Sequence, residues 1–263
     1  MKLRNKKYVE INGEKVFISS ENDKISLDLN NRNIYDLSDV FGLEFLTDLT
    51  DLNLESNNIS DLSCLENLIN LRSLNLSSNQ IDNLSDIKKL INLQKLNLKS
   101  NKIRNIKDLQ FLSNLSYLDL SKNHISNLNG VEKLKNLQFL RLNHNSIKDL
   151  NKLSTLENLE MLNFESNMVN KLEQLKNLKN IQTLKFDNNP AYSWAMDNFG
   201  DTFKENPQKI MDYFQDPIKQ RMDGVREELI RKIPSKDRIL LYFEELKLWW
   251  LKKKINDAFY TKR

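Results

Sequence analysis

The stretch Leu74-Asn75-Leu76-Ser77-Ser78-Asn79-Gln80-Ile81 returns almost unchanged as Leu96-Asn97-Leu98-Lys99-Ser100-Asn101-Lys102-Ile103. Its last asparagine recurs every 22 residues, at Asn57, Asn79, Asn101, Asn123, Asn145, Asn167 and Asn189. A fixed period of roughly 20 to 50 residues is typical of a stack of identical supersecondary units. Because each unit buries its apolar side chains against its neighbours, such a stack has one continuous core.

Each unit carries the pattern Leu-x-x-Leu-x-Leu-x-x-Asn-x-Ile, which predicts a short strand followed by a turn. The Leu-x-Leu pair alternates apolar and polar residues, the period of a β-strand. Apolar residues then recur at every third position, as in Leu62, Leu65, Leu68 and Leu71, a spacing that suits a tight helical or 3₁₀ return. The asparagine amide can donate and accept, so we expect it to bind backbone groups of the turn and of the neighbouring coil. We assign these leucines and asparagines to the scaffold.

The N-terminal end departs from the regular pattern. Asn12-Gly13 between two β-prone runs in residues 8–18 predicts a hairpin that caps the open end of the stack. The first repeat, starting near Leu27, is degenerate, since Arg32 stands where the asparagine belongs and three extra residues fall within 39–45. We therefore divide the chain into an N-terminal β-hairpin cap (1–24), one degenerate and seven regular repeats (25–189), and a C-terminal α-helical domain (190–263).

The C-terminal end is built differently, because all four prolines and all three tryptophans lie after residue 189. Asn206-Pro207 and Asp216-Pro217 each place a capping side chain before a proline, which predicts helix starts. We expect helices near 191–199, 207–215, 217–232 and 236–260. The last of these is apolar on nearly all sides and includes Trp249 and Trp250, so it either packs against the repeats or forms a second contact, with a partner or with another copy of the chain.

Composition and motifs exclude several classes of function. Forty basic and 36 acidic residues give a net charge of +4, too weak a balance to predict nucleic-acid binding. Cys64 is the only cysteine, which excludes internal disulfides and thiolate zinc clusters. His124 and His144 have no ligand or nucleophile motif beside them, so we predict neither an enzyme nor a cofactor. The sequence shows no secretory signal and no stretch that could span a bilayer, which favours a soluble cytoplasmic protein.

The strand residues that flank the buried leucines predict a partner-binding surface on the open face of the sheet. Three successive units place Tyr117, Phe139 and Met161 side by side there, and apolar groups gathered on one exposed face indicate an interface. Polar and charged residues surround them: Lys95, Lys99, Asp119, Lys122, Arg141 and His144. Two alternatives stay open, namely that the C-terminal helices cover these residues or that they have no role.

The repeat phrase, as it stands in Leu71–Ile81 and Leu93–Ile103, resembles the leucine-rich repeat family. The 22-residue length is similar to the class found in bacterial internalins and in the regulatory subunit of protein phosphatase-1. The resemblance covers residues 25–189 and implies an α/β solenoid with a parallel sheet on its concave face, used to grip other proteins. It departs from the family in two ways: internalins are exported, whereas no export signal appears here, and residues 190–263 match no part of either relative.

We accordingly expect a non-enzymatic module that binds another protein through the concave face. The alternative is a sensor or regulatory subunit that controls an effector enzyme, such as a phosphatase, through its C-terminal helices.

Overall fold

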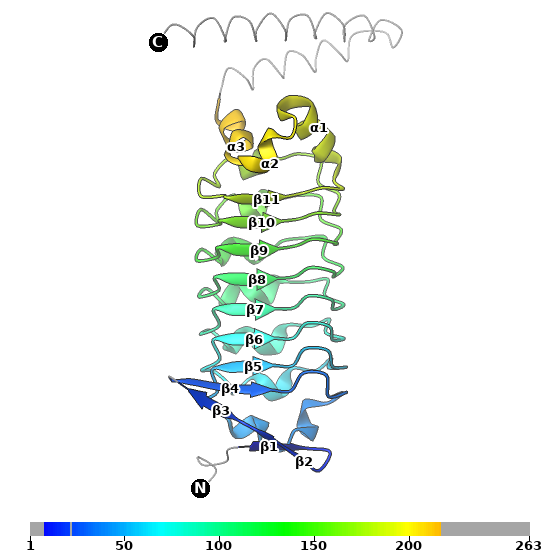
Figure 1. The fold of residues 1–263 in the computed structure, drawn as a ribbon, viewed down its shortest axis with the longest axis vertical. Helices are drawn as coiled ribbons and strands as arrows, with labels where there is room; N and C mark the ends of the chain where they lie inside the picture. The colour runs from blue at the N-terminus through cyan, green and yellow to red at the C-terminus, as the bar shows by residue number, and fades with distance from the viewer. Residues whose placement is uncertain (1–7, 22, 217–263) are drawn as a thin grey trace, which may run out of the picture. The chain divides into compact units, whose positions relative to one another are not determined.

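The computed structural model of the chain describes residues 8–21 and 23–216. The chain divides into two compact units, Met1–Asp212 and Tyr213–Arg263. The first unit contains the repeats, which are stacked along its length (Figure 1). The helices predicted at 217–232 and 236–260, together with Trp249 and Trp250, lie outside the described residues.

One nine-stranded sheet runs through the repeats, and its strands lie side by side in chain order from β3 to β11. Its members are β3 (Ser19–Glu21), β4 (Lys24–Asp28), β5 (Asp51–Asn53), β6 (Ser73–Asn75), β7 (Lys95–Asn97), β8 (Tyr117–Asp119), β9 (Phe139–Arg141), β10 (Met161–Asn163) and β11 (Thr183–Lys185). Strands β4 to β11 are parallel, one from each repeat, and β3 pairs antiparallel with β4. The register places equivalent residues opposite one another, as with Leu96 against Leu118 and Leu118 against Leu140. We call the outward side of this sheet the concave face.

Each strand from β4 to β10 is followed by a return segment whose helical part is a short 3₁₀ turn, as the every-third spacing predicted. These turns are η1 (Leu37–Asp39), η2 (Leu43–Phe45), η3 (Ser63–Leu65), η4 (Ser85–Lys89), η5 (Lys107–Phe111), η6 (Val131–Lys133), η7 (Asn151–Leu153) and η8 (Glu173–Leu175). The repeat leucines and isoleucines are buried between the sheet and the returns. The prediction of one continuous apolar core shared by all coils is confirmed.

The recurring asparagines join each coil to the one before it, as predicted. Asn123 is typical: its Nδ2 donates to the carbonyl oxygens of Leu98 (2.9 Å) and Leu120 (3.0 Å), and its Oδ1 accepts from the N–H of Ile103 (3.0 Å). Leu98 and Ile103 belong to the preceding coil and Leu120 to its own. Because these amides pair backbone groups that would otherwise be buried unsatisfied, the asparagines are part of the scaffold.

Two regularities of the scaffold were not predicted. The residue before each of these asparagines has a left-handed conformation, with φ between 54° and 57°, at Ser56, Ser78, Ser100, Lys122, His144, Ser166 and Asn188. A second asparagine column, also spaced by 22 residues, donates from Nδ2 to a carbonyl oxygen of the preceding coil at 2.8–3.0 Å: Asn70, Asn92, Asn114, Asn136, Asn158 and Asn180. The 22-residue spacing of these asparagines in the sequence would have been sufficient to predict the second column.

The N-terminal hairpin is confirmed as β1 (Tyr8–Ile11) and β2 (Glu14–Phe17). Asn12 and Gly13 both have positive φ, as a two-residue hairpin turn requires. The hairpin joins the first repeat through Glu10 and Phe41, whose backbones exchange two hydrogen bonds of 3.2 and 2.9 Å. The extra residues of the degenerate repeat lie at this junction, where they include the additional turn η2.

Up to residue 216, where the described part of the chain ends, three helices follow the last repeat: α1 (Pro190–Phe199), α2 (Thr202–Glu205) and α3 (Gln208–Gln215). The first and third match the predictions, whereas α2 was not predicted. The ring of Phe186 stacks on that of Phe164 (centroids 5.6 Å apart) and contacts those of Tyr192 (5.6 Å) and Phe203 (5.2 Å). Helices α1 and α2 therefore close the apolar end of the repeat core. Within the described part of the chain, no helix is long and apolar enough to cross a membrane.

Candidate functional site

The concave face brings the three predicted apolar residues together. Tyr117, Phe139 and Met161 begin strands β8, β9 and β10 and are direct neighbours in the register. Phe139 is 38% exposed, and the other two are half-buried. Adjacent strands lie about 4.8 Å apart, so the three side chains form a short continuous stripe, which we call the apolar row.

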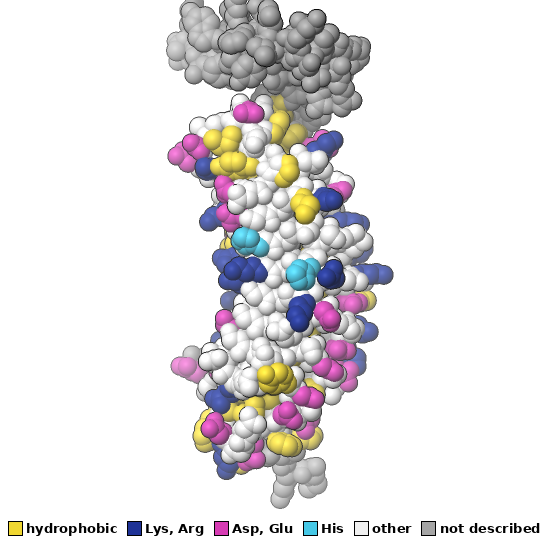
Figure 2. Space-filling model, turned by 90° about the vertical axis from the view of Figure 1, so that its right-hand side faces the viewer, with side chains coloured by type: hydrophobic (Ala, Val, Ile, Leu, Met, Phe, Trp, Pro, Cys, Tyr) yellow, Lys and Arg dark blue, Asp and Glu magenta, His cyan; other side chains and the backbone are white. Residues whose placement is uncertain are grey.

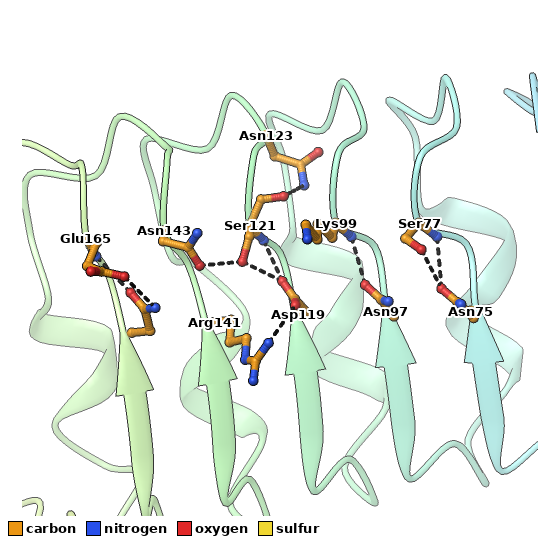
Figure 3. A network of polar contacts seen from close by, with 11 residues as sticks. Asn75, Ser77, Asn97, Lys99, Asp119, Ser121, Asn123, Arg141, Asn143 and Glu165 are labelled. Atoms are coloured by element: carbon orange, nitrogen blue, oxygen red, sulfur yellow. Dashed lines mark hydrogen bonds and ion pairs between the residues drawn. The ribbon is translucent and has the colours of Figure 1, made fainter. Parts of the chain in front are cut away.

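A polar network lies at the ends of strands β8 and β9 (Figure 3), two residues along these strands from Tyr117 and Phe139. Asp119 Oδ1 accepts from the N–H (2.9 Å) and the hydroxyl (2.5 Å) of Ser121, and its Oδ2 lies 3.9 Å from Nη1 of Arg141. The Ser121 hydroxyl is also 2.6 Å from the side-chain oxygen of Asn143. A hydroxyl has a single proton, so Ser121 donates to the carboxylate, and turning over the Asn143 amide lets its nitrogen donate to Ser121.

Asp119 is better assigned a positioning role than the contact role predicted for it. Its side chain is only 4% exposed and its oxygens already have partners on two coils. Burial, together with the charge of Asp119 and a hydrogen bond to it, raises the pKa of Tyr117. We infer that this carboxylate holds Tyr117 and Arg141 in place, whereas the rings and the guanidinium meet the solvent.

The predicted basic residues lie beside the apolar row and past the ends of strands β7 to β9. Lys95 is exposed and is the register neighbour of Tyr117. Lys99, Lys122 and His144 are exposed where the chain leaves the strands. Figure 2 views the side on which the chain leaves the strands. It shows basic side chains and both histidines over the middle coils.

The strand residues between the two buried leucines of each repeat form a central column on the concave face. Polar residues recur in this column because they shape the turn that follows the strand. The side-chain oxygens of Asn75, Asn97 and Asn163 accept from the N–H two residues later at 3.0–3.1 Å, which shapes the turn at the end of the strand. Asp119 does the same in β8. Arg141 occupies this column in β9 and cannot accept a hydrogen bond, so it is not there for the turn. Arg141 was predicted from the sequence, whereas Ser121 and Asn143 were not, because the contact that joins them lies between two coils.

A shallow groove was not predicted. Its volume is about 980 Å³, it lies where the chain enters strands β5 to β9, and it is lined by Asp48, Thr50, Asn70, Arg72, Asn92, Gln94, Asn114, Ser116 and Asn136. Its asparagines belong to the second column and already donate to backbone carbonyls. The described residues contain no group of three or more His, Cys, Asp or Glu side chains placed to hold a metal ion.

Comparisons with known proteins agree with this architecture. Two family models described as leucine-rich repeat match the chain, one over residues 91–147 and the other over 45–64 and 67–84. A search of curated proteins finds no match.

Several solved structures are similar. Internalin C2 of Listeria monocytogenes is 32% identical with a TM-score of 0.60, and the match covers 63% of this chain and 72% of that one. Internalin F of the same organism is 31% identical with a TM-score of 0.57, over 60% of this chain and 46% of that one, so this chain spans less than half of its length. The plant peptide hormone receptor RGFR1, solved in complex with RGF2, is 24% identical with a TM-score of 0.54 over 64% of this chain and 28% of the receptor, and shares the fold.

The 22-residue period, the parallel sheet, the asparagine ladder and the identity to internalin C2 over most of that protein lead to the same conclusion. This chain belongs to the leucine-rich repeat family.

Proposed function

We propose that this chain is a non-enzymatic interaction module that binds a partner protein through its concave face. The observation that carries the proposal is the apolar row Tyr117, Phe139 and Met161, which lies partly exposed in the middle of an otherwise polar sheet. Aromatic side chains next to an arginine are the residue types that most often dominate binding energy at protein interfaces. A cytoplasmic location belongs to the same proposal and rests on the sequence alone.

The scaffold supports this function because it holds the surface rigid. Adjacent coils are joined by strand pairing and by a recurring asparagine, and Asp119 contacts the residues beside the apolar row. A surface that is already ordered loses little conformational entropy when it binds, so more of the contact energy appears as affinity.

The test is affinity capture from a lysate of the native host with the full chain and with Tyr117→Ala/Phe139→Ala. We expect the double variant to lose at least about tenfold in captured partner, because hot-spot truncations typically cost roughly 2 kcal/mol or more. Its melting temperature should stay within a few degrees of the parent, since both rings meet solvent.

The matched control is Ile91→Ala/Phe111→Ala, which removes two exposed apolar side chains of the return segments. Capture by this control should equal that of the parent chain. Equal capture by the Tyr117/Phe139 variant would remove the apolar row from the binding surface.

A further inference from the structure

Three lysines near the apolar row carry charge that the described structure leaves unbalanced. Lys95, Lys99 and Lys122 are exposed, and none of the ion pairs among the described residues includes them. We call them the lysine cluster. The nearby carboxylate of Asp119 is buried and faces Arg141 and Ser121 instead.

The fold does not require lysine at these three positions. In the preceding coil the registers of Lys95 and Lys99 are filled by Ser73 and Ser77, and the strand pairing is unchanged. The left-handed position of Lys122 is serine in four other coils. Long cationic side chains at sites where serine satisfies the scaffold indicate a role outside the scaffold.

One member of the lysine cluster, Lys95, continues the apolar row, and the other two, Lys99 and Lys122, lie just past the ends of β7 and β8. In the register, Lys95 lies beside Tyr117, Tyr117 beside Phe139, and Phe139 beside Met161. Three strand spacings of about 4.8 Å make this stripe roughly 14 Å long. An extended peptide rises about 3.3 Å per residue, so four to five residues of a partner span its length.

We propose that the partner presents an extended acidic segment with an adjoining apolar residue, its carboxylates meeting the lysine cluster and its apolar side chain the apolar row. This inference rests on the proposed function and adds the chemistry of the partner. Charge assistance makes ammonium–carboxylate contacts stronger than neutral hydrogen bonds, and oppositely charged surfaces steer association.

A nucleic acid is the competing ligand for lysines beside aromatic rings, but the surrounding charges favour a short acidic peptide. The column that contains Lys99 has carboxylates at Glu55 and Glu165, two coils before it and three coils after it. A long phosphate backbone crossing the coils would meet both carboxylates. A segment of four to five residues fits between them.

The experiment is selection of a random twelve-residue peptide display library on the full chain, followed by affinity measurement of the enriched peptides. We expect an excess of Asp and Glu next to an aromatic or aliphatic residue. Affinity should fall at least about tenfold for Lys95→Ser/Lys99→Ser/Lys122→Ser, and it should also fall as NaCl is raised from about 50 to 500 mM, because salt screens exposed charges. Serine is the residue that other coils carry at these registers, so the variant keeps the scaffold.

Lys88→Ser/Lys107→Ser/Lys133→Ser is the charge-matched control, since it removes three exposed lysines from η4, η5 and η6. Its affinity should equal that of the parent. Peptides that need Tyr117 and Phe139 but bind the lysine-cluster variant normally would overturn the acidic partner and leave the proposed function standing. Peptides whose affinity changes with neither the lysine-cluster variant nor the Tyr117/Phe139 variant would contradict both the acidic partner and the proposed function. A labelled oligo-dT that binds more tightly than the peptides, and depends on the lysine cluster, would replace the acidic peptide with a nucleic acid.

Discussion

At the residue scale, the two asparagine columns give a direct comparison between a buried and an exposed amide. Asn101 is buried and makes hydrogen bonds of 3.0–3.1 Å with backbone groups of Leu76, Leu98 and Ile81. Asn92 is exposed and donates one bond of 2.9 Å to the Ile69 carbonyl.

We predict that Asn101→Ala lowers the free energy of unfolding by about 3 kcal/mol or more, because each buried backbone group left without a partner costs roughly 1–3 kcal/mol. Asn92→Ala should cost about 1 kcal/mol or less, since water replaces the exposed bond. Urea denaturation followed by circular dichroism measures both. Equal losses would mean that burial does not set the value of these amides.

Asn123 and Asp119 show what the sequence could and could not predict at single positions. Asn123 was assigned to the scaffold because an amide that recurs every 22 residues has a fixed set of backbone partners. Asp119 was predicted as a contact because its column faces outward. Its burial depends on Ser121, Asn143 and Arg141 from two coils, and no pattern within one repeat contains that information.

At the scale of secondary structure, the helices after the last repeat have a definite task. Phe203 of α2 is 1% exposed and packs on Phe186, in the last coil, and on Tyr192. Without this ring, the apolar end of the core would be open to water.

We predict that Phe203→Ala lowers the free energy of unfolding by about 3–5 kcal/mol, the usual cost of truncating a buried phenylalanine. Hydrogen exchange should accelerate most in β11 and α1, because each coil of a solenoid contacts only its neighbours. The matched control Phe111→Ala removes a half-exposed ring of η5 and should cost less than about 1 kcal/mol. A uniform acceleration from β4 to β11 would contradict a local capping role.

Strands and returns were predictable because their periods, two and three, appear in every unit. Strand β3 and helix α2 were not. Ser19–Glu21 is polar and exposed and joins the sheet through its backbone pairing with β4. Helix α2 has four residues, too few for a periodic signal, and it is placed by the packing of Phe203 rather than by helix propensity.

At the scale of the whole molecule, the stack of coils was predictable because repetition specifies it many times over. The proposed binding surface was predictable only as a set of departures from the repeat. Tyr117, Phe139 and Arg141 differ from what their columns carry elsewhere, and the resemblance among the coils makes those differences visible. The repeated residues specify the scaffold, so the repeat pattern by itself predicts no ligand.

Truncation separates the two functions considered for the chain. A chain ending at Asp216 keeps Phe203, Ile210 and Met211, which are all buried, and should melt within a few degrees of the full chain. A chain ending at Asn189 exposes Phe186, loses its cover, and should melt lower and aggregate, since an uncapped solenoid end is apolar.

If the concave face carries the function, the chain ending at Asp216 captures the partner as well as the full chain does, and Tyr117→Ala/Phe139→Ala within it lowers capture by at least about tenfold. If a folded chain ending at Asp216 loses the partner, the contact belongs to residues 217–263, where Trp249 and Trp250 lie, and the regulatory alternative replaces the proposal. Circular dichroism and the melting temperature establish that the truncated chain is folded. Capture measured beside them then decides which part of the molecule binds.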